Sequence, residues 1–519
     1  MTRNFDAIVI GSGIGGLTSG ALCAKAGLRV LVLERNDTFG GAARVYNHNG
    51  LAIESSLHEV DGFDEADPKL PVIRSLGLDI DLQFIDVGDL YEVRGGPIGA
   101  PFVLPHGAVA AQAAAIARFP QHQAGLEEYF RRLFALRGAV SLAARHREDI
   151  DWWFLHAPEA ARRLWPLLAE GHATLGSVLR ELFGDDEAVK LALTANLAYY
   201  HDDPDNMLFV LFAIPQASYL IGGGHYIRGG SQALTDRLVA IIKANGGVLE
   251  AGREATAILI EHDRVTGVRH ASRTGGDQRT DGARIVLGNA APTVLAGMLP
   301  QGQEDRFVAR YEGRSPSISL WTVTLGLSRP AKDFGVRRYS TFVLPVWMTR
   351  LSQMIEASFV MGREPGDRMP PYVFVDYRQI DSGLNQDGPS VVTLCGADSL
   401  ANWAHRSADA KKAHKSAWIA ALIADIDSHF PGLASTVVHS EMATAETMQH
   451  YLNTPDGAVY GFAPERTPGK STNAGARTAI NGLWLASAYT WGGGFTGAMF
   501  GGAEAAREAL RSAAVKDQA

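Results

Sequence analysis

The sequence predicts an α/β fold in which a domain built on a parallel sheet is interleaved along the chain with a second domain of helices and mixed sheet. Three observations predict it. An apolar strand at residues 6–10 leads directly into a glycine-rich turn and a helix, and a similar strand, turn and helix lie at residues 482–512. Between these ends, residues 107–215 have helical periodicity. Several stretches of residues 293–465 alternate apolar and polar side chains, as half-buried strands do.

The length and composition indicate a globular protein with two domains. At 519 residues the chain is too long for one simple core. Its net charge of −8 at pH 7 argues against a nucleic acid partner. Cys23 and Cys395 lie far apart, so the sequence predicts neither a disulfide framework nor a metal site. The sequence assigns no oligomeric state.

The N-terminal residues run directly into the first strand and leave no room for a cleavable signal, so we expect a cytoplasmic location. The most hydrophobic run, Met207–Ile214, is far shorter than the ~20 residues needed to span a bilayer. The apolar segment at residues 342–348 is a candidate for peripheral membrane contact, with a buried strand as the alternative.

The first element is a strand at Asp6–Ile10, followed at once by a G-x-G-x-x-G turn at residues 11–16. In such a turn the first glycine permits the sharp bend, the second lets the backbone approach a pyrophosphate, and the third packs the helix on the strand. The diphosphate would lie at the helix N-terminus, where free N–H groups favour negative charge. The residues predicted to contact it are Gly11, Gly13, Ile14, Gly15 and Gly16.

The second strand, at residues 29–33, completes a Rossmann-type βαβ unit. Glu34 stands at its end, where a carboxylate can accept hydrogen bonds from an adenosine ribose. The unit predicts a bound dinucleotide but does not separate FAD from NAD. In the next stretch, the paired Gly40 and Gly41 allow close backbone approach, and Arg44 offers a cation for the diphosphate. The alternative is an ordinary glycine turn with a solvated arginine.

Glu34-Arg35, Gly40-Gly41, Arg44 and residues 50–58 resemble the opening of a flavoprotein family that contains phytoene desaturases, carotenoid isomerases and retinol saturases. The family lies within the amine-oxidase-like flavoproteins, so the resemblance implies FAD as cofactor and a GR2-like domain with a parallel sheet and a β-meander. The family usually places the arginine directly after the paired glycines, whereas Ala42 and Ala43 intervene here. The resemblance implies that residues 55–58 run past the flavin ring. Further cofactor contacts implied by the resemblance are Arg35, Ala42, Ser56, Leu57 and His58.

Residues 222–292 are similar to a family segment that re-enters the dinucleotide-binding domain, with Ile227 in place of a proline. In relatives, the stretch matching residues 253–255 lies by the adenine, which implies a backbone contact from Ala255. Asn289 follows a strand that leads out towards the substrate domain. The resemblance implies an FAD-binding domain at residues 1–105, 220–292 and 466–519, and a substrate-binding domain at residues 106–219 and 293–465.

The C-terminal strand at residues 482–486 is followed by a glycine-rich turn and a helix expected from Ala498 to Ser512. A helix N-terminus pointed at the flavin would stabilise the negative charge that develops on reduction. The pattern resembles the family's C-terminal flavin motif, and residues 494–499 are closest to the saturases. No acidic residue occupies the turn, which argues against an amine oxidase. The residues implied as contacts are Ser487, Trp491, Gly494, Phe495 and Thr496.

The predicted function is FAD-dependent redox chemistry on carbon–carbon bonds of a lipophilic substrate, such as a polyene, isoprenoid or fatty-acid-like molecule. Desaturation, saturation and isomerisation all remain open, and an oxygen-dependent amine oxidase is the alternative. The candidate catalytic residues are His58, His225, Tyr226 and Tyr489. The interior or a pocket wall is the expected place of six aromatic residues: Trp152, Trp153, Phe154, Trp165, Tyr199 and Tyr200.

Overall fold

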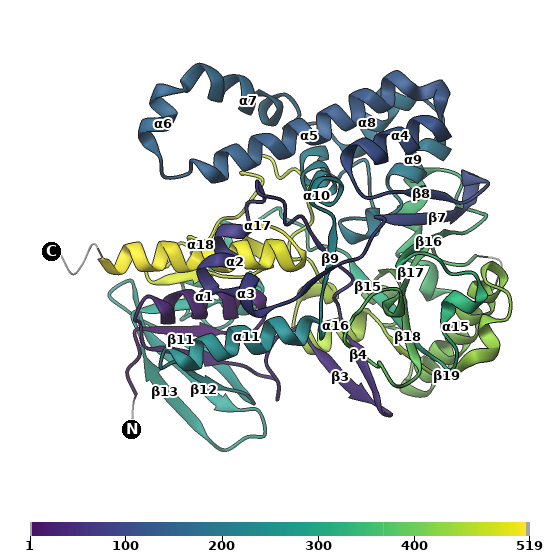
Figure 1. Cartoon of the computed structure of the whole chain (residues 1–519). Coiled ribbons are helices and arrows are strands. Elements are labelled where there is room, and N and C mark those ends of the chain that lie inside the picture. The colour runs from purple at the N-terminus through teal and green to yellow at the C-terminus, as the bar shows by residue number, and fades with distance from the viewer. Residues whose placement is uncertain (1–2, 367, 515–519) are drawn as a thin grey trace.

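The computed structural model describes residues 3–366 and 368–514. It confirms the α/β fold (Figure 1). A five-stranded sheet of parallel strands forms the first domain, and each of its strands lies where the sequence predicts one. In sheet order the strands are β10 (Val248–Glu250), β2 (Val30–Leu33), β1 (Ala7–Ile10), β14 (Ile285–Gly288) and β20 (Leu483–Leu485).

Both faces of the parallel sheet are covered, which is why its strands are apolar throughout. Along β1, Ala7 and Val9 belong to one core cluster and Ile8 and Ile10 to another, because successive side chains point to opposite faces. The first cluster includes residues of α1 (Ile14–Lys25), α11 (Ser231–Ala244) and α18 (Gly494–Ala514). The second includes residues of β11 (Arg253–Glu261) and β12 (Arg264–Ser272), which form an antiparallel meander with β13 (Gln278–Gly282). Three layers result.

The second sheet is mixed and has seven strands. Only the β16–β7 pair is parallel among its neighbouring strands. In order, its strands are β19 (Val437–Ala443), β15 (Ser319–Leu327), β18 (Ser390–Asp398), β17 (Tyr372–Asp376), β16 (Ser340–Leu344), β7 (Tyr91–Gly95) and β8 (Phe102–Leu104). The long helix α15 (Ala408–His429) packs Trp418, Leu422 and Ile426 into the core of this sheet.

A helical region lies above both sheets in the view of Figure 1. It contains α4 (Ala108–Arg118), α5 (Gln123–Arg145), α6 (Ile150–Leu155), α7 (Ala157–Ala169), α8 (Leu175–Phe183), α9 (Glu187–Leu193) and α10 (Phe209–Gly222). Most of the apolar run at residues 207–214 lies in α10, which packs against α5. Among the described residues, no helix is both long enough and apolar enough to cross a membrane.

Smaller elements connect these parts. They include the hairpin of β3 (Val45–His48) and β4 (Leu51–Glu54), and a small sheet of β5 (Val60–Asp61), β9 (Gly224–Ile227) and β6 (Phe84–Asp86). The remaining helices are α2 (Leu70–Leu76), α3 (Leu78–Asp81), α12 (Pro292–Ala296), α13 (Glu304–Val308), α14 (Met354–Ala357), α16 (Ala445–Leu452) and α17 (Ala488–Trp491). The domain boundaries stay a prediction. Strands β7 and β8 come from residues 1–105, yet they add to the seven-stranded sheet.

One expectation about the aromatic residues is wrong, whereas the buried strand considered for residues 342–348 is confirmed. Phe154 and Trp165 are 84% and 63% exposed, instead of lying in the interior or a pocket wall, because no element of the described residues covers their side of α6 and α7. The segment at 342–348 is largely buried, since its first residues form β16 inside the seven-stranded sheet. Only Val346 within it is strongly exposed, so this segment is not a membrane-facing surface.

Candidate cofactor and active site

The loops that follow four parallel strands meet at the carboxyl edge of the five-stranded sheet. Gly11 follows β1, Glu34 follows β2, Asn289 follows β14 and Ser487 lies just beyond β20. Ligands of open α/β sheets bind at this edge. The structure therefore brings together predicted site residues that lie far apart in the sequence.

The glycine-rich turn is built so that side chains would block it. Gly11 has a φ of +90°, which favours glycine, and a Cβ on Gly16 would lie 2.2 Å from the Gly11 carbonyl oxygen. A Cβ on Gly15 would lie 2.2 Å from the Ala486 carbonyl oxygen, at the end of β20. Gly13 caps α1 without a side-chain hydrogen bond, so the N–H groups of the first helical turn, starting at Ile14, can face an anion.

Glu34 is buried beside the turn, and its carboxylate holds the turn in place. Oε2 accepts hydrogen bonds from the Ser12 N–H at 2.9 Å and from the Ser12 hydroxyl at 2.6 Å, and Oε1 accepts one from the Asn36 N–H at 2.7 Å. A carboxylate has about four acceptor positions, so one remains for a ribose hydroxyl. The Arg253 N–H donates to the Glu34 carbonyl at 2.7 Å, which places the start of β11, and Ala255 in it, next to this end of β2.

The paired glycines approach the turn closely. Gly40 forms a backbone bridge with Gly13, and a Cβ on Gly41 would lie 3.1 Å from the Gly13 Cα. Within the described residues, the Arg44 side chain makes no ion pair, and Arg35 has a buried Nε without a hydrogen-bond partner. Unused donors on two cationic side chains that flank the paired glycines in the chain fit a diphosphate.

Glu54 organises the segment expected to pass the flavin. Its buried carboxylate accepts from the N–H groups of Ser56 and Leu57, both at 3.0 Å, and from the Ser231 N–H at 2.7 Å. Burial raises the pKa of Glu54, while these hydrogen bonds oppose that shift. The Tyr226 hydroxyl lies 3.4 Å from Oε2, so this candidate catalytic residue supports Glu54 from inside the protein. Sequence reasoning missed Glu54, because two of its partners, Ser231 and Tyr226, come from a distant part of the chain.

The loop from Ser56 to His58 contacts the dinucleotide-binding domain, the region of the seven-stranded sheet and the helical region. The Ser56 hydroxyl donates to the Ala42 carbonyl at 2.8 Å, and the Tyr377 hydroxyl donates to the Leu57 carbonyl at 3.3 Å. His58 Nδ1 lies 2.9 Å from the hydroxyl of Tyr199. Burial lowers the pKa of His58 to about 4, so its ring is neutral at pH 7.

Glu59 is an ionisable group at this end that sequence reasoning also missed. Its Oε2 is buried and has no hydrogen-bond partner among the described residues. Burial, and then the charge of Asp61, raise the pKa of Glu59 to about 8, so its carboxyl group is protonated at neutral pH. An unpaired buried acid next to a predicted flavin contact is a candidate for proton transfer.

The C-terminal turn contacts the same region. Helix α18 begins at Gly494 instead of Ala498, so Phe495 and Thr496 lie in its first turn. The Thr496 hydroxyl donates to Asp61 at 2.7 Å, close to Glu59 in the chain. Ser487 caps the short helix α17 and accepts from the Tyr489 N–H at 3.4 Å.

The side chains of three predicted site residues, His225, Tyr489 and Trp491, contact groups other than the site residues described above. His225 and Tyr226 are neighbours on β9 and so point to opposite faces; the His225 ring contacts Phe63, with ring centroids 4.9 Å apart. The Tyr489 ring packs edge-on against Phe462, and its buried hydroxyl has no partner in the described part of the chain. Trp491 donates its indole N–H to Glu504 and is partly exposed. The roles of all site residues stay predictions.

Comparison with known proteins gives relatives over most of the chain. Residues 9–70 match the family described as NAD(P)-binding Rossmann-like domain. The human all-trans-retinol 13,14-reductase is 25% identical over 88% of this chain and 77% of its own length. The prolycopene isomerase of Daucus carota is 23% identical over 93% and 76%, and the neurosporene-forming phytoene desaturase of Cereibacter sphaeroides is 26% identical over 51% and 50%.

Solved structures support the fold. An oxidoreductase from Methanosarcina mazei superposes with a TM-score of 0.61 at 17% identity, covering 96% of this chain and 99% of its own. The cyclohexylamine oxidase from Brevibacterium oxydans superposes with a TM-score of 0.59 at 16% identity and full coverage of both chains. At such identities the likeness concerns the fold.

Proposed function

We propose that the chain is an FAD-dependent oxidoreductase of the phytoene desaturase type, which carries out redox chemistry on carbon–carbon bonds of a lipophilic polyene or isoprenoid substrate, as its relatives suggest. One observation carries the proposal. The glycine-rich turn, the loop at residues 54–61 and the C-terminal turn converge at one edge of the sheet, as a bound FAD requires. Desaturation, saturation and isomerisation all fall within the proposal.

The residues would divide the work along the cofactor. The turn at residues 11–16, Arg35 and Arg44 would hold the diphosphate, and Glu34 would hold the ribose. Bound FAD supplies hydride transfer to or from a substrate carbon. At the other end the protein must orient the substrate and exclude water, which buried tyrosines can do.

We place the proton-transfer role on Glu59, with His58 and Tyr199 as its neighbours. Saturation of a double bond needs one proton for each hydride, and a protonated carboxyl group can donate it. His58 has a pKa of about 4 and is neutral, so it serves at pH 7 as a hydrogen-bonding partner of Tyr199 instead of a proton store. Tyr226 supports Glu54, and His225 and Tyr489 lie against other rings.

The amine oxidase alternative has support from the fold alone. A small pocket lined by paired aromatic side chains from the C-terminal turn would favour an amine oxidase. Tyr489 instead packs against Phe462, and Trp491 turns to Glu504 on α18. These side chains therefore do not favour an amine site.

The decisive experiment starts with the absorption spectrum of the purified protein. Flavin bands should bleach on anaerobic reduction and recover in air or with another acceptor. The reduced protein and the oxidised protein are then mixed separately and anaerobically with retinoids and carotenoids. Mass spectrometry of the products detects a gain of two hydrogens by reduction or a loss of two by desaturation, and chromatographic retention detects a change of isomer. A colourless protein that FAD cannot reconstitute would undo the proposal, and bleaching by amines alone would favour the alternative.

We also propose that the exposed side of α6 and α7 contacts a membrane from which a lipophilic substrate is taken. Figure 1 shows these two helices at the outer end of α5. Five large apolar side chains there are at least 63% exposed: Ile150, Phe154, Leu155, Trp165 and Leu168. The surfaces of soluble proteins rarely expose so many large apolar side chains close together. Helices that lie on a bilayer insert side chains of this kind into it.

Liposome flotation tests this contact. The variant Phe154→Ser with Trp165→Ser should bind at least about 10-fold more weakly than wild type, because burying each large apolar side chain contributes about 1.5–3 kcal/mol. Val346→Ser removes an isolated apolar side chain that is 90% exposed and should float like wild type. Equal flotation of both variants, or none by wild type, would contradict the proposed contact.

A further inference from the structure

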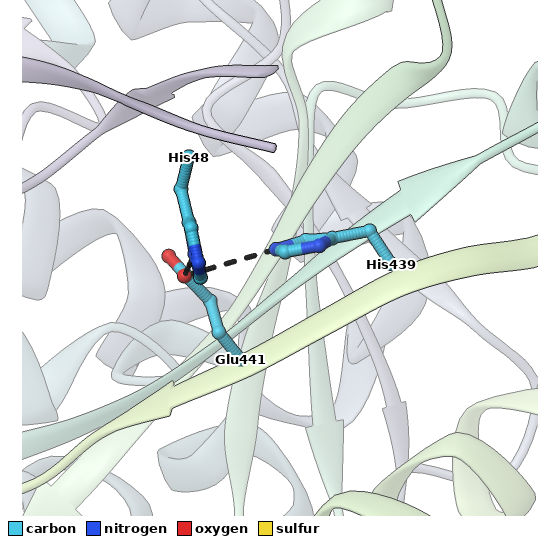
Figure 2. A group of neighbouring side chains, drawn as sticks. All are labelled: His48, His439 and Glu441. Carbon is cyan, nitrogen blue, oxygen red and sulfur yellow. Dashed lines mark hydrogen bonds and ion pairs between the residues drawn. The ribbon is translucent and has the colours of Figure 1, made fainter. Parts of the chain in front are cut away.

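We propose that His48, His439 and Glu441 form a binding site for a divalent transition-metal ion, with Zn²⁺ as the natural probe. The site joins the β3–β4 hairpin to β19, the edge strand of the seven-stranded sheet. The ligand atoms of the three residues lie within 4.8 Å of one another. Figure 2 shows the His48 ring and the Glu441 carboxylate facing each other, with the His439 ring beside them.

The backbone fixes all three side chains. His439 and Glu441 are two residues apart on β19, so both point to the same face of the strand. His48 ends β3, directly before a two-residue hairpin turn in which Asn49 and Gly50 have φ values of 51° and 81°. Such turns are tight and define the register of the hairpin.

Gly326 leaves the space that brings these elements together. It pairs with His439 across β15 and β19, and a Cβ there would lie 3.0 Å from the His439 Cβ and 2.8 Å from Leu51 Cδ1 of the hairpin. The glycine therefore lets the hairpin and the histidine share one face of the sheet.

The separations suit a metal ion after small side-chain rotations. Zn²⁺ binds imidazole nitrogen and carboxylate oxygen at about 2.0–2.2 Å, so two ligand atoms of a tetrahedral site lie about 3.4 Å apart. His439 Nε2 lies 3.7 Å from Glu441 Oε2, and His48 Nδ1 is in direct contact with the same oxygen. Two imidazoles with one carboxylate favour zinc and similar ions over Mg²⁺ or Ca²⁺.

A second observation points to a ligand. The His439 side chain is only 10% exposed, and its buried Nε2, directed at Glu441, has no hydrogen-bond partner among the described residues. The other Glu441 oxygen accepts a hydrogen bond from the Tyr46 hydroxyl, which orients the carboxylate and leaves Oε2 directed at the two rings. Partners of this kind that hold a ligand in place are typical of metal sites.

The site lies where an ion would affect the cofactor loops. The hairpin runs from Val45 to Glu54, between the predicted diphosphate contact Arg44 and the carboxylate that holds Ser56 and Leu57. A bound ion would hold this hairpin against β19 of the seven-stranded sheet. Because His48 and Glu441 are 393 positions apart, the sequence shows no metal-ligand spacing, and the proposal departs from the expectation that the chain has no metal site.

Isothermal titration of the FAD-loaded protein with Zn²⁺, after chelator treatment and dialysis, tests the proposal. Wild type should bind one ion, and excess Mg²⁺ should not compete. His48→Ala and His439→Ala should weaken binding by at least about 100-fold, and Tyr46→Phe by about 10–100-fold, since loss of an outer partner typically has that effect. His405→Ala changes an exposed histidine outside the cluster and should bind like wild type.

Bound flavin absorbance reports that each variant is folded. If His439→Ala fails to fold, the half-exposed His48 and the conservative Tyr46→Phe still decide the matter. The proposal is overturned if wild type binds no Zn²⁺, or if His48→Ala and Tyr46→Phe bind it as tightly as His405→Ala does.

Discussion

Replacing Glu34 with alanine should weaken FAD binding by about 10- to 100-fold. The carboxylate is 4% exposed and has one acceptor position left after its bonds to Ser12 and Asn36. A hydrogen bond from a ribose hydroxyl to a charged acceptor contributes about 1.5–3 kcal/mol, and each 1.4 kcal/mol is about tenfold in affinity. The truncation also leaves the buried Ser12 N–H without its acceptor, which loosens the glycine-rich turn.

The assay is a titration of the apoprotein with FAD, followed by flavin absorbance, together with the flavin-to-protein ratio after gel filtration. Glu254→Ala is the matched control, because this glutamate is exposed on the nearby strand β11. It should bind FAD like wild type. Urea unfolding of each apoprotein separates lost affinity from lost stability.

The result that refutes the reasoning is a Glu34→Ala variant that binds FAD within about twofold of wild type while Ser12 and the turn stay folded. The carboxylate would then serve the turn alone, and the dinucleotide would be held by the helix N-terminus and the cations. Glu34→Gln adds a discriminating case. It keeps one acceptor oxygen but loses the charge, so an affinity between those of wild type and Glu34→Ala is expected.

Three further predictions concern packing and pH. Gly15→Ala should destabilise the protein by about 1–3 kcal/mol in urea unfolding, because its Cβ would lie 2.2 and 3.0 Å from two backbone oxygens. Gly138→Ala is the control inside α5: its Cβ would meet nothing within 4 Å, so it should stabilise the protein by about 0.5–1 kcal/mol. His201 is buried, which lowers its pKa, but hydrogen bonds to two carboxylates outweigh this and raise the pKa to about 9. Its stabilising effect is thus complete below about pH 6.5 and is lost towards pH 9, so the stability gap between wild type and His201→Gln in urea should shrink over that range. If Glu59 donates a proton, the rate of polyene reduction should fall as pH rises through about 8, and Glu59→Gln should be slow and lack this dependence. An unchanged pH profile in Glu59→Gln would assign the proton to another group.

The parts of the fold that depend on local pattern could be predicted from the sequence. The strand, glycine turn and helix at residues 7–25 are encoded within one short stretch, and Glu34 follows at a fixed distance. Exposure could not be predicted in this way. Phe154 and Trp165 have the apolar character of core residues, but whether a helix face is covered depends on elements far away in the chain.

The same reason explains the site contacts that the sequence did not reveal. Glu54 gains its role from Ser231, and the contact of His58 with Tyr199 joins residues 141 positions apart. Neither contact leaves a pattern in the nearby sequence, because each depends on how the interleaved segments fold back on one another. The glycine-rich motif predicts where a dinucleotide binds, but only the folded structure shows that Glu59 is buried and has a raised pKa.

The loop at residues 57–58 is held from both parts of the predicted substrate domain. Tyr199, from the helical part, contacts the His58 ring, while Tyr377 and Tyr339, from the sheet part, donate to the backbone carbonyls of Leu57 and His58. The loop that is expected to pass the flavin is therefore positioned by tyrosines from the predicted substrate domain. Because these three hydroxyls hold the loop, replacing any of the three tyrosines with phenylalanine should shift the position of His58 and change the absorbance of bound FAD.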